Sequence, residues 1–238
     1  LYWLQVSAMQ DFAQSFFHLG INLLAQADND KKIDTALSWI IKAADNNEQH
    51  AQYALSQIYL RGNGVTVDIK RGENLLKAAA DNGLAEAQFE YARREIEKGS
   101  DSSVIAPFMV AAAEQGFVSA FLQAAQFLRD GEGVENDLSR TAFFFKQAAD
   151  NGDAHAQLET ARNFDNGFGM PKDREEAVRY YQLSAAQGLI EAEMKLAEAF
   201  NQGDGIKADF KQAFVYYMRA AKKGNVDAAY NLGMMLQA

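Results

Sequence analysis

The chain has 238 residues, of which 48% are hydrophobic and 23% are charged, so its composition is that of a folded globular protein rather than a disordered or fibrous one. It contains no cysteine, which excludes disulfides, thiolate metal sites and cysteine nucleophiles. Its formal net charge of −9 argues against nucleic acid as a partner, and its longest apolar run, residues 104–113, is too short for membrane insertion.

Helices are predicted over nearly the whole chain, because apolar residues recur three or four positions apart and no long segment alternates polar and apolar residues. A short motif of small and polar residues that ends in glycine recurs at intervals of 36, 33, 36, 36 and 36 residues. The motif ends at Asn47, which replaces the glycine in the first copy, and at Gly83, Gly116, Gly152, Gly188 and Gly224. A fixed period of this length is the signature of a repeat protein.

Two columns of residues keep the same register. An alanine stands four residues after each motif end, and a large residue stands eight residues before it. The alanines are Ala51, Ala87, Ala120, Ala156, Ala192 and Ala228, and the large residues are Trp39, Leu75, Phe108, Phe144, Tyr180 and Tyr216. We expect the alanines to permit close approach of helices and the large residues to fill the space between them.

A second motif, Gly-x-Gly followed by a hydrophobic residue, divides four of the repeats into two helices. The first glycine can take the positive φ that ends a helix. Aspartates four residues after the second glycine are the predicted N-caps of the second helices, at Asp68, Asp137, Asp173 and Asp209. Glu176 and Gln212 are expected to complete capping boxes. Because such helix pairs bury their apolar faces mainly against adjacent pairs, the sequence predicts an all-α solenoid.

We expect a single solenoid domain over residues 1–238. Its repeats are predicted at 15–50, 51–86, 87–119, 120–155, 156–191 and 192–227, with half repeats at 1–14 and 228–238. The third repeat is short and has Lys98–Ser103 and Pro107 in place of the Gly-x-Gly turn, so an irregularity is expected near 98–107. Neither half repeat has the polar face of a solenoid cap, which favours a fragment of a longer array.

The recurring pattern resembles the Sel1-like repeat, a relative of the tetratricopeptide repeat with longer loops. The resemblance covers essentially the whole chain. In the second repeat it rests on Ala51, Tyr53, Leu55, Tyr59, Gly62, Gly64, Val65, Asp68, Lys77, Ala78, Ala79 and Gly83.

This resemblance implies a right-handed α/α superhelix of about six helix-turn-helix repeats, with the first helix of each repeat on a concave face. It also implies a scaffold or adaptor that binds a protein or peptide in a bacterial envelope or signalling assembly, with the periplasm or cell envelope as the location.

No catalytic motif is found. The chain lacks the sequence signatures of serine hydrolases, zinc proteases and P-loop enzymes, and Asp28–Asp30 begins like a calcium loop but has Ile33 where that loop needs glycine. His50 and His155 occupy the same repeat position three repeats apart, so they are too distant to share a metal ion. We therefore expect neither enzyme activity nor a cofactor or metal.

The candidate binding positions lie on the first helices, where packing leaves the residue type free to vary. They are Gln57, Arg93, Gln126, Arg162 and Glu198, six residues after each alanine, together with Arg129. The three arginines are expected to form a positive stripe suited to a carboxylate-bearing peptide or polymer. Each residue is equally consistent with an ordinary solvated surface.

The alternative from another class is a module that binds glycan or peptidoglycan and positions a partner or fused enzyme. A row of exposed aromatic residues on the concave face would favour glycan, whereas a polar and charged face would favour a peptide.

Substitution of the alanine column tests the repeat packing. Ala156→Leu or Ala192→Leu should destabilise the fold by roughly 1 to 3 kcal/mol, because the larger side chain overfills the helix contact. Urea unfolding measures the effect, and unchanged midpoints in both variants would show that the column lies outside the core.

Overall fold

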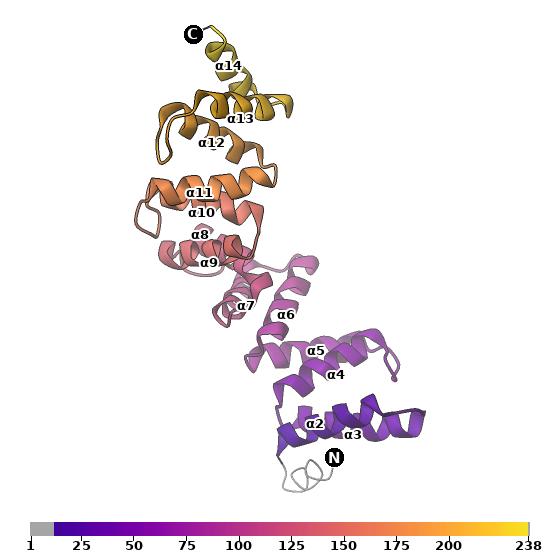
Figure 1. Cartoon of the computed structure of the whole chain (residues 1–238). Coiled ribbons are helices and arrows are strands. Elements are labelled where there is room, and N and C mark those ends of the chain that lie inside the picture. Colours follow the sequence, from indigo (N-terminus) through magenta and orange to yellow (C-terminus); the bar gives the residue numbers. More distant parts are fainter. Residues whose placement is uncertain (1–11, 238) are drawn as a thin grey trace. The chain divides into compact units, whose positions relative to one another are not determined.

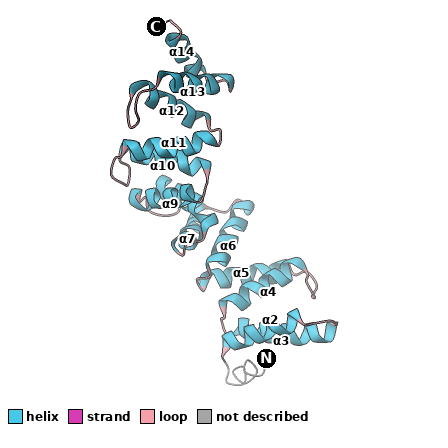
Figure 2. Ribbon diagram, in the orientation of Figure 1, coloured by secondary structure: helices cyan, strands magenta, loops and turns pink. Residues whose placement is uncertain are grey.

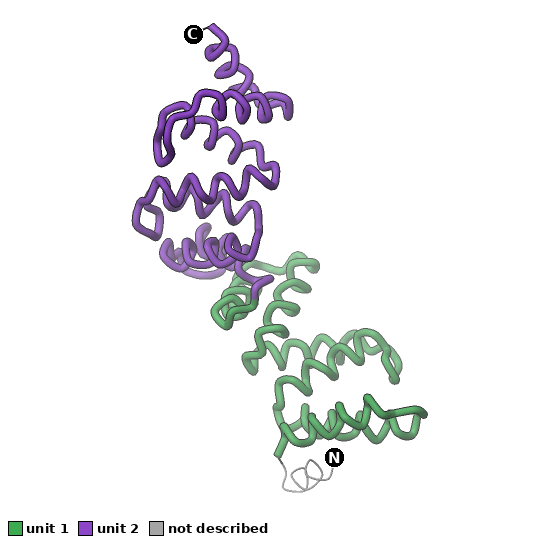
Figure 3. The backbone as a smooth tube through the Cα atoms, in the orientation of Figure 1, with its two compact units in different colours: residues 1–117 green, residues 118–238 purple. Residues whose placement is uncertain are grey.

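The computed structural model describes residues 12–237. Within this range the chain forms thirteen α-helices and one short 3₁₀-helix, with no strand (Figures 1 and 2). The predicted half repeat at 1–14 therefore lies almost wholly outside the described residues. No helix of the described part is long and apolar enough to cross a bilayer. The chain divides into two compact units, residues 1–117 and 118–238 (Figure 3).

The described part of unit 1 contains three consecutive helix pairs. The second helix of each of the first two pairs also packs against the first helix of the next pair. The pairs are α2 (Ala13–Ala25) with α3 (Asp30–Asp45), α4 (Gln49–Arg61) with α5 (Ile69–Asp81), and α6 (Ala85–Lys98) with α7 (Ser102–Glu114).

Unit 2 repeats this arrangement after a short 3₁₀-helix, η1 (Val118–Ala120). Its pairs are α8 (Phe121–Asp130) with α9 (Leu138–Asp150), α10 (Ala154–Asn166) with α11 (Arg174–Ala186), and α12 (Ile190–Gln202) with α13 (Phe210–Lys222), followed by α14 (Val226–Met235). The predicted all-α architecture of stacked helix pairs is confirmed in each unit. The assignment of the whole chain to one solenoid domain with the stated boundaries stays a prediction.

The turns within the repeats have the predicted geometry. The first helices α4, α8, α10 and α12 each end at a glycine with φ between 69° and 76°. The side chain of each predicted N-cap aspartate accepts a backbone N–H bond from the first turn of the second helix, as Asp68 does from Arg71 at 2.9 Å. Asn47 takes a positive φ of 59°, so it adopts the conformation of the glycine that it replaces.

The predicted capping boxes are wrong. The backbone N–H that Glu176 would accept belongs to Asp173, but this N–H donates to the carbonyl of Phe164 at 2.9 Å. The Glu176 carboxylate pairs with Arg179 instead. The N–H of Asp209 likewise donates to the Phe200 carbonyl, so the cap ties the second helix to the first.

The two residue columns form the core. All six alanines of the alanine column are fully buried, and none of the large residues is exposed. In unit 2 the large residue of a second helix stacks on an aromatic ring of its paired first helix. The centroids of Phe164 and Tyr180 are 5.8 Å apart, and those of Phe200 and Tyr216 are 5.9 Å apart.

The second glycine of the Gly-x-Gly turn lets neighbouring repeats meet. A Cβ atom at Gly169 would overlap the carbonyl of Leu138, the first residue of α9, and one at Gly205 would overlap the carbonyl of Arg174, the first residue of α11. Both glycines also have φ near 70°. The turn of one repeat thus packs against the start of the second helix of the preceding repeat.

The third repeat is irregular where expected, although not in the expected way. α6 ends at Gly99 and α7 is capped by Asp101, so there is no second glycine. Pro107 lies inside α7 rather than in the turn, where it removes one helical N–H donor. Lys98 reaches Glu73 of α5 at 3.0 Å. An ion pair therefore joins these repeats at the turn in place of glycine packing.

Two glycine substitutions separate backbone strain from repeat packing. Gly152→Ala introduces only a strained positive φ, because nothing lies within 4 Å of the added Cβ, and it should cost roughly 1 to 2 kcal/mol. Gly169→Ala adds the overlap with Leu138 and should cost about 2 to 3 kcal/mol more. Equal shifts in the urea midpoints of the two variants would contradict the packing role of Gly169.

Candidate partner-binding site

A buried polar residue holds each of three first helices between two second helices. This residue is a glutamine that follows the column alanine, at Gln52, Gln88 and Gln157. The side-chain nitrogen of Gln157 donates to the Ala149 carbonyl at 3.2 Å, and its oxygen accepts from the Gln187 amide at 2.9 Å. Gln52 and Gln88 make the same two bonds, to Ala44 and Asn82 and to Ala80 and Gln115 respectively. We call this arrangement the clasp.

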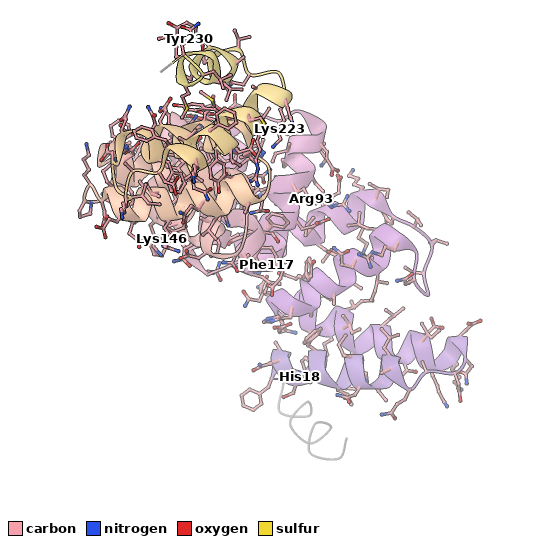
Figure 4. All side chains as sticks on the ribbon, turned by 45° about the horizontal axis from the view of Figure 1, so that its top comes forward. His18, Arg93, Phe117, Lys146, Lys223 and Tyr230 are labelled. Atoms are coloured by element: carbon pink, nitrogen blue, oxygen red, sulfur yellow. The ribbon has the colours of Figure 1, made fainter. Side chains whose placement is uncertain are left out.

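The clasp is ionic in the last pair of unit 2. Glu193 takes the place of glutamine and is only 3% exposed, and Lys223, labelled in Figure 4, takes the place of the amide partner. The Lys223 ammonium lies 3.0 Å from both carboxylate oxygens and also donates to the Gly188 carbonyl. In α8 the position is held by Phe121, whose ring stacks on Phe144 with centroids 6.0 Å apart.

Sequence reasoning missed the clasp. Its only signal is the recurrence of glutamine directly after the column alanine, together with the change to an acid at Glu193 and a base at Lys223 thirty residues later.

The candidate residues of unit 1 lie on α4 and α6. Gln57 is partly buried, and its side-chain nitrogen has no hydrogen-bond partner among the described residues. Arg93, labelled in Figure 4, is half exposed and pairs with Glu90 at 3.0 Å and with Glu97 at 2.8 Å. The hydrogen bonds to Glu90 raise the pKa of the Arg93 guanidinium.

Two candidate residues of unit 2, Arg129 and Arg162, join in a charged network that crosses three first helices. Arg129 of α8 pairs with Asp130 at 2.8 Å and lies 3.9 Å from Glu159 of α10. Glu159 also pairs with Arg162, which in turn contacts Glu191 of α12. Gln126 is exposed beside this network, and Glu198 pairs with Lys195 at 2.9 Å. We call these surface residues of α8, α10 and α12 the first-helix face of unit 2.

The expected stripe of positive charge is wrong for this face. Each arginine is already paired with carboxylates, and α8, α10 and α12 together carry six acidic but only three basic residues. The second helices α9, α11 and α13 carry three acidic and seven basic residues.

The ion pairs of Arg162 also affect its pKa. Burial lowers the pKa of Arg162, but the hydrogen bond to Glu191 and the charges of Glu159 and Glu191 raise this pKa overall.

Aromatic side chains are absent from the exposed surface of the first helices α4, α6, α8, α10 and α12. The exposed aromatic residues of the described chain are Phe12, Phe143, Phe168, Phe210 and Tyr230, and of these Tyr230 alone lies on a first helix, α14. Residues 12–237 contain no group of three or more histidine, aspartate or glutamate side chains placed to hold a metal ion. The arrangement thus offers ion pairs and hydrogen bonds to a partner.

The family of the chain follows from its repeats. The model of the Sel1 repeat matches residues 17–48, 49–84, 122–153, 154–189, 190–225 and 226–238. The chain therefore belongs to the Sel1 repeat family, whose members are generally protein-interaction scaffolds rather than enzymes. Residues 85–121, which include the irregular third repeat, are not matched. No protein with a curated description matches the chain.

Solved structures of Sel1 repeat proteins share the fold. A Sel1 repeat protein from Oxalobacter formigenes is 28% identical, with a TM-score of 0.59 over 88% of this chain and 86% of its own. A protective antigen of uropathogenic Escherichia coli is 24% identical, with a TM-score of 0.61 over 99% of this chain. The present chain spans 51% of the length of that antigen.

Exchange of the ionic clasp for an amide clasp tests its role. Lys223→Gln leaves the buried Glu193 carboxylate without its counter-ion and should cost about 2 to 3 kcal/mol, less than a fully buried pair because Lys223 is partly exposed. Glu193→Gln combined with Lys223→Gln recreates the Gln157–Gln187 pair and should return stability to within about 1 kcal/mol of the native chain. Urea unfolding of both variants measures this recovery; its absence would contradict the clasp.

Proposed function

We propose that this chain is a non-catalytic scaffold or adaptor that binds a protein or peptide partner on its first helices. The proposal extends to the chain the general role of its family. The partner contacts are assigned to Gln126, Arg129, Arg162 and Glu198 in unit 2 and to Gln57 and Arg93 in unit 1. As the resemblance implies, we place this role in a bacterial envelope or signalling assembly.

The observation that carries the proposal is the charged network of the first-helix face of unit 2. It runs across three helices from Asp130 to Glu191, so a bound segment lying along it would meet charges of alternating sign. Such a pattern complements a polypeptide that carries side chains of both signs, and it favours specificity over affinity.

The polar character of this face also favours a peptide over a glycan. Protein sites for sugars stack them on exposed aromatic rings, and the first helices α4 to α12 expose none. The glycan- or peptidoglycan-binding alternative therefore has less support.

Selection from a library of random linear peptides, run beside a glycan array, tests the proposal. We expect peptides to be enriched and the glycan array to stay blank. Arg129→Gln combined with Arg162→Gln should weaken the selected peptides by roughly tenfold, because two charged contacts are lost. The thermal midpoint should fall only slightly, since both arginines are partly exposed.

The matched control is Lys207→Gln combined with Lys222→Gln, which makes the same change of net charge at exposed lysines outside the first helices. Lys146 and Arg179 of the second helices are unsuitable for this control, because Lys146 pairs with Asp150 and Arg179 lies over the ring of Tyr180. Equal loss of binding in both double variants, or enrichment of glycans alone, would overturn the proposed function.

A further inference from the structure

A shallow pocket of about 200 Å³ lies on α8 and the turn that follows it. It is lined by Gln123, Gln126, Phe127, Asp130 and Glu132, so it combines two amides, a phenyl ring and two carboxylates. None of the lining residues is basic. The pocket includes Gln126, one of the residues assigned to the partner.

Backbone hydrogen bonds fix the turn that forms one wall of the pocket. The N–H of Glu132 donates to the Phe127 carbonyl at 3.2 Å, and the N–H of Asp137 donates to the Leu128 carbonyl at 3.2 Å. The side-chain amide of Asn136 donates to the Arg129 carbonyl. Because these bonds hold the turn against α8, the pocket is formed before a ligand arrives.

Of the two carboxylates in the pocket, one is unpaired. Asp130 accepts N–H bonds from Arg129 at both oxygens, at 2.8 and 3.2 Å, and these bonds lower its pKa. Glu132 is exposed with no side-chain partner in the described part of the chain. At the positions of Gln126 and Gln123, α10 has Arg162 and Glu159, and α12 has Glu198 and Lys195. Among α8, α10 and α12, α8 alone has uncharged residues at both positions.

We propose that this pocket binds a lysine or arginine side chain of the partner. The aliphatic stem lies along the Phe127 ring, and the amide oxygens of Gln123 and Gln126 accept N–H bonds. The unpaired carboxylate of Glu132 binds the charged end, and the Asp130 carboxylate, shared with Arg129, adds negative charge beside it. The inference rests on the proposed function and deepens it, because it assigns a basic residue to the partner segment.

Titration of the full chain, labelled with ¹⁵N, tests the pocket directly. The probes are the blocked tripeptides acetyl-Gly-Arg-Gly-amide and acetyl-Gly-citrulline-Gly-amide, which differ in charge but hardly in shape. The arginine peptide should shift the backbone amide signals of residues 126–132 in a saturable manner, and the citrulline peptide should bind at least roughly fivefold more weakly. No shift in these signals, or equal affinity for both peptides, would overturn the inference.

Paired substitutions locate the effect. Asp130→Asn combined with Glu132→Gln should weaken binding of the arginine peptide roughly tenfold. Glu175→Gln combined with Asp227→Asn makes the same charge change at exposed carboxylates outside the pocket and should leave binding unchanged. Equal weakening by both would assign binding to net charge and reject the pocket.

The two proposals fail in different experiments. If library peptides bind but the pocket signals do not respond to the arginine tripeptide, only the pocket inference is rejected. If the library yields no peptide, the proposed function is rejected, and the titration still decides whether the pocket takes a basic side chain.

Discussion

One side chain that both donates and accepts a hydrogen bond sets the spacing of the helices. In the clasp, a glutamine amide donates to the end of one second helix and accepts from the residue that ends the next. A buried carbonyl or amide without a partner costs about 1 to 3 kcal/mol, so each clasp resists separation of three helices at once. The alanine beside it must be small for the helices to come this close. The first helices therefore display their surface on a scaffold whose geometry is specified by polar contacts as well as by apolar burial.

The parts of this structure that depend on local rules were predictable from the sequence. A glycine at a helix end, an aspartate at a helix start and a buried alanine at a fixed period each follow from contacts within a few residues. The capping boxes failed because the backbone N–H of Asp173 prefers a carbonyl of the preceding helix, a partner that a search of the nearest three or four residues does not include.

The surface electrostatics were harder to predict for a similar reason. The pairing of Arg162 with Glu159 follows from a spacing of three residues on a helix. Its contact with Glu191 crosses to another first helix and depends on how the pairs stack. Whether an arginine makes a surface positive therefore depends on its neighbours in space as well as on its neighbours in the sequence.

The paired charges of the first-helix face have a consequence for recognition. A partner that forms an ion pair with Arg162 must displace or share the carboxylates of Glu159 and Glu191, so the net gain in binding energy is the difference between the old and new contacts. The pocket on α8 has no such competitor at Glu132. Within one face, the chain thus combines groups that discriminate between partners with a site where charge is available for binding.

The change of one clasp from amides to ions makes the repeats non-equivalent despite their common length. Duplication or exchange of repeats is the simplest way for such a chain to grow or diverge. Glu193 and Lys223 belong to the same repeat, so exchange of whole repeats keeps this ion pair together. A junction between the two helices of the repeat would separate them. If α12 were joined to a second helix that ends at Gln187, the Glu193 carboxylate would be buried opposite a neutral amide, without its counter-ion. One buried charge therefore favours recombination between whole repeats over recombination within this repeat.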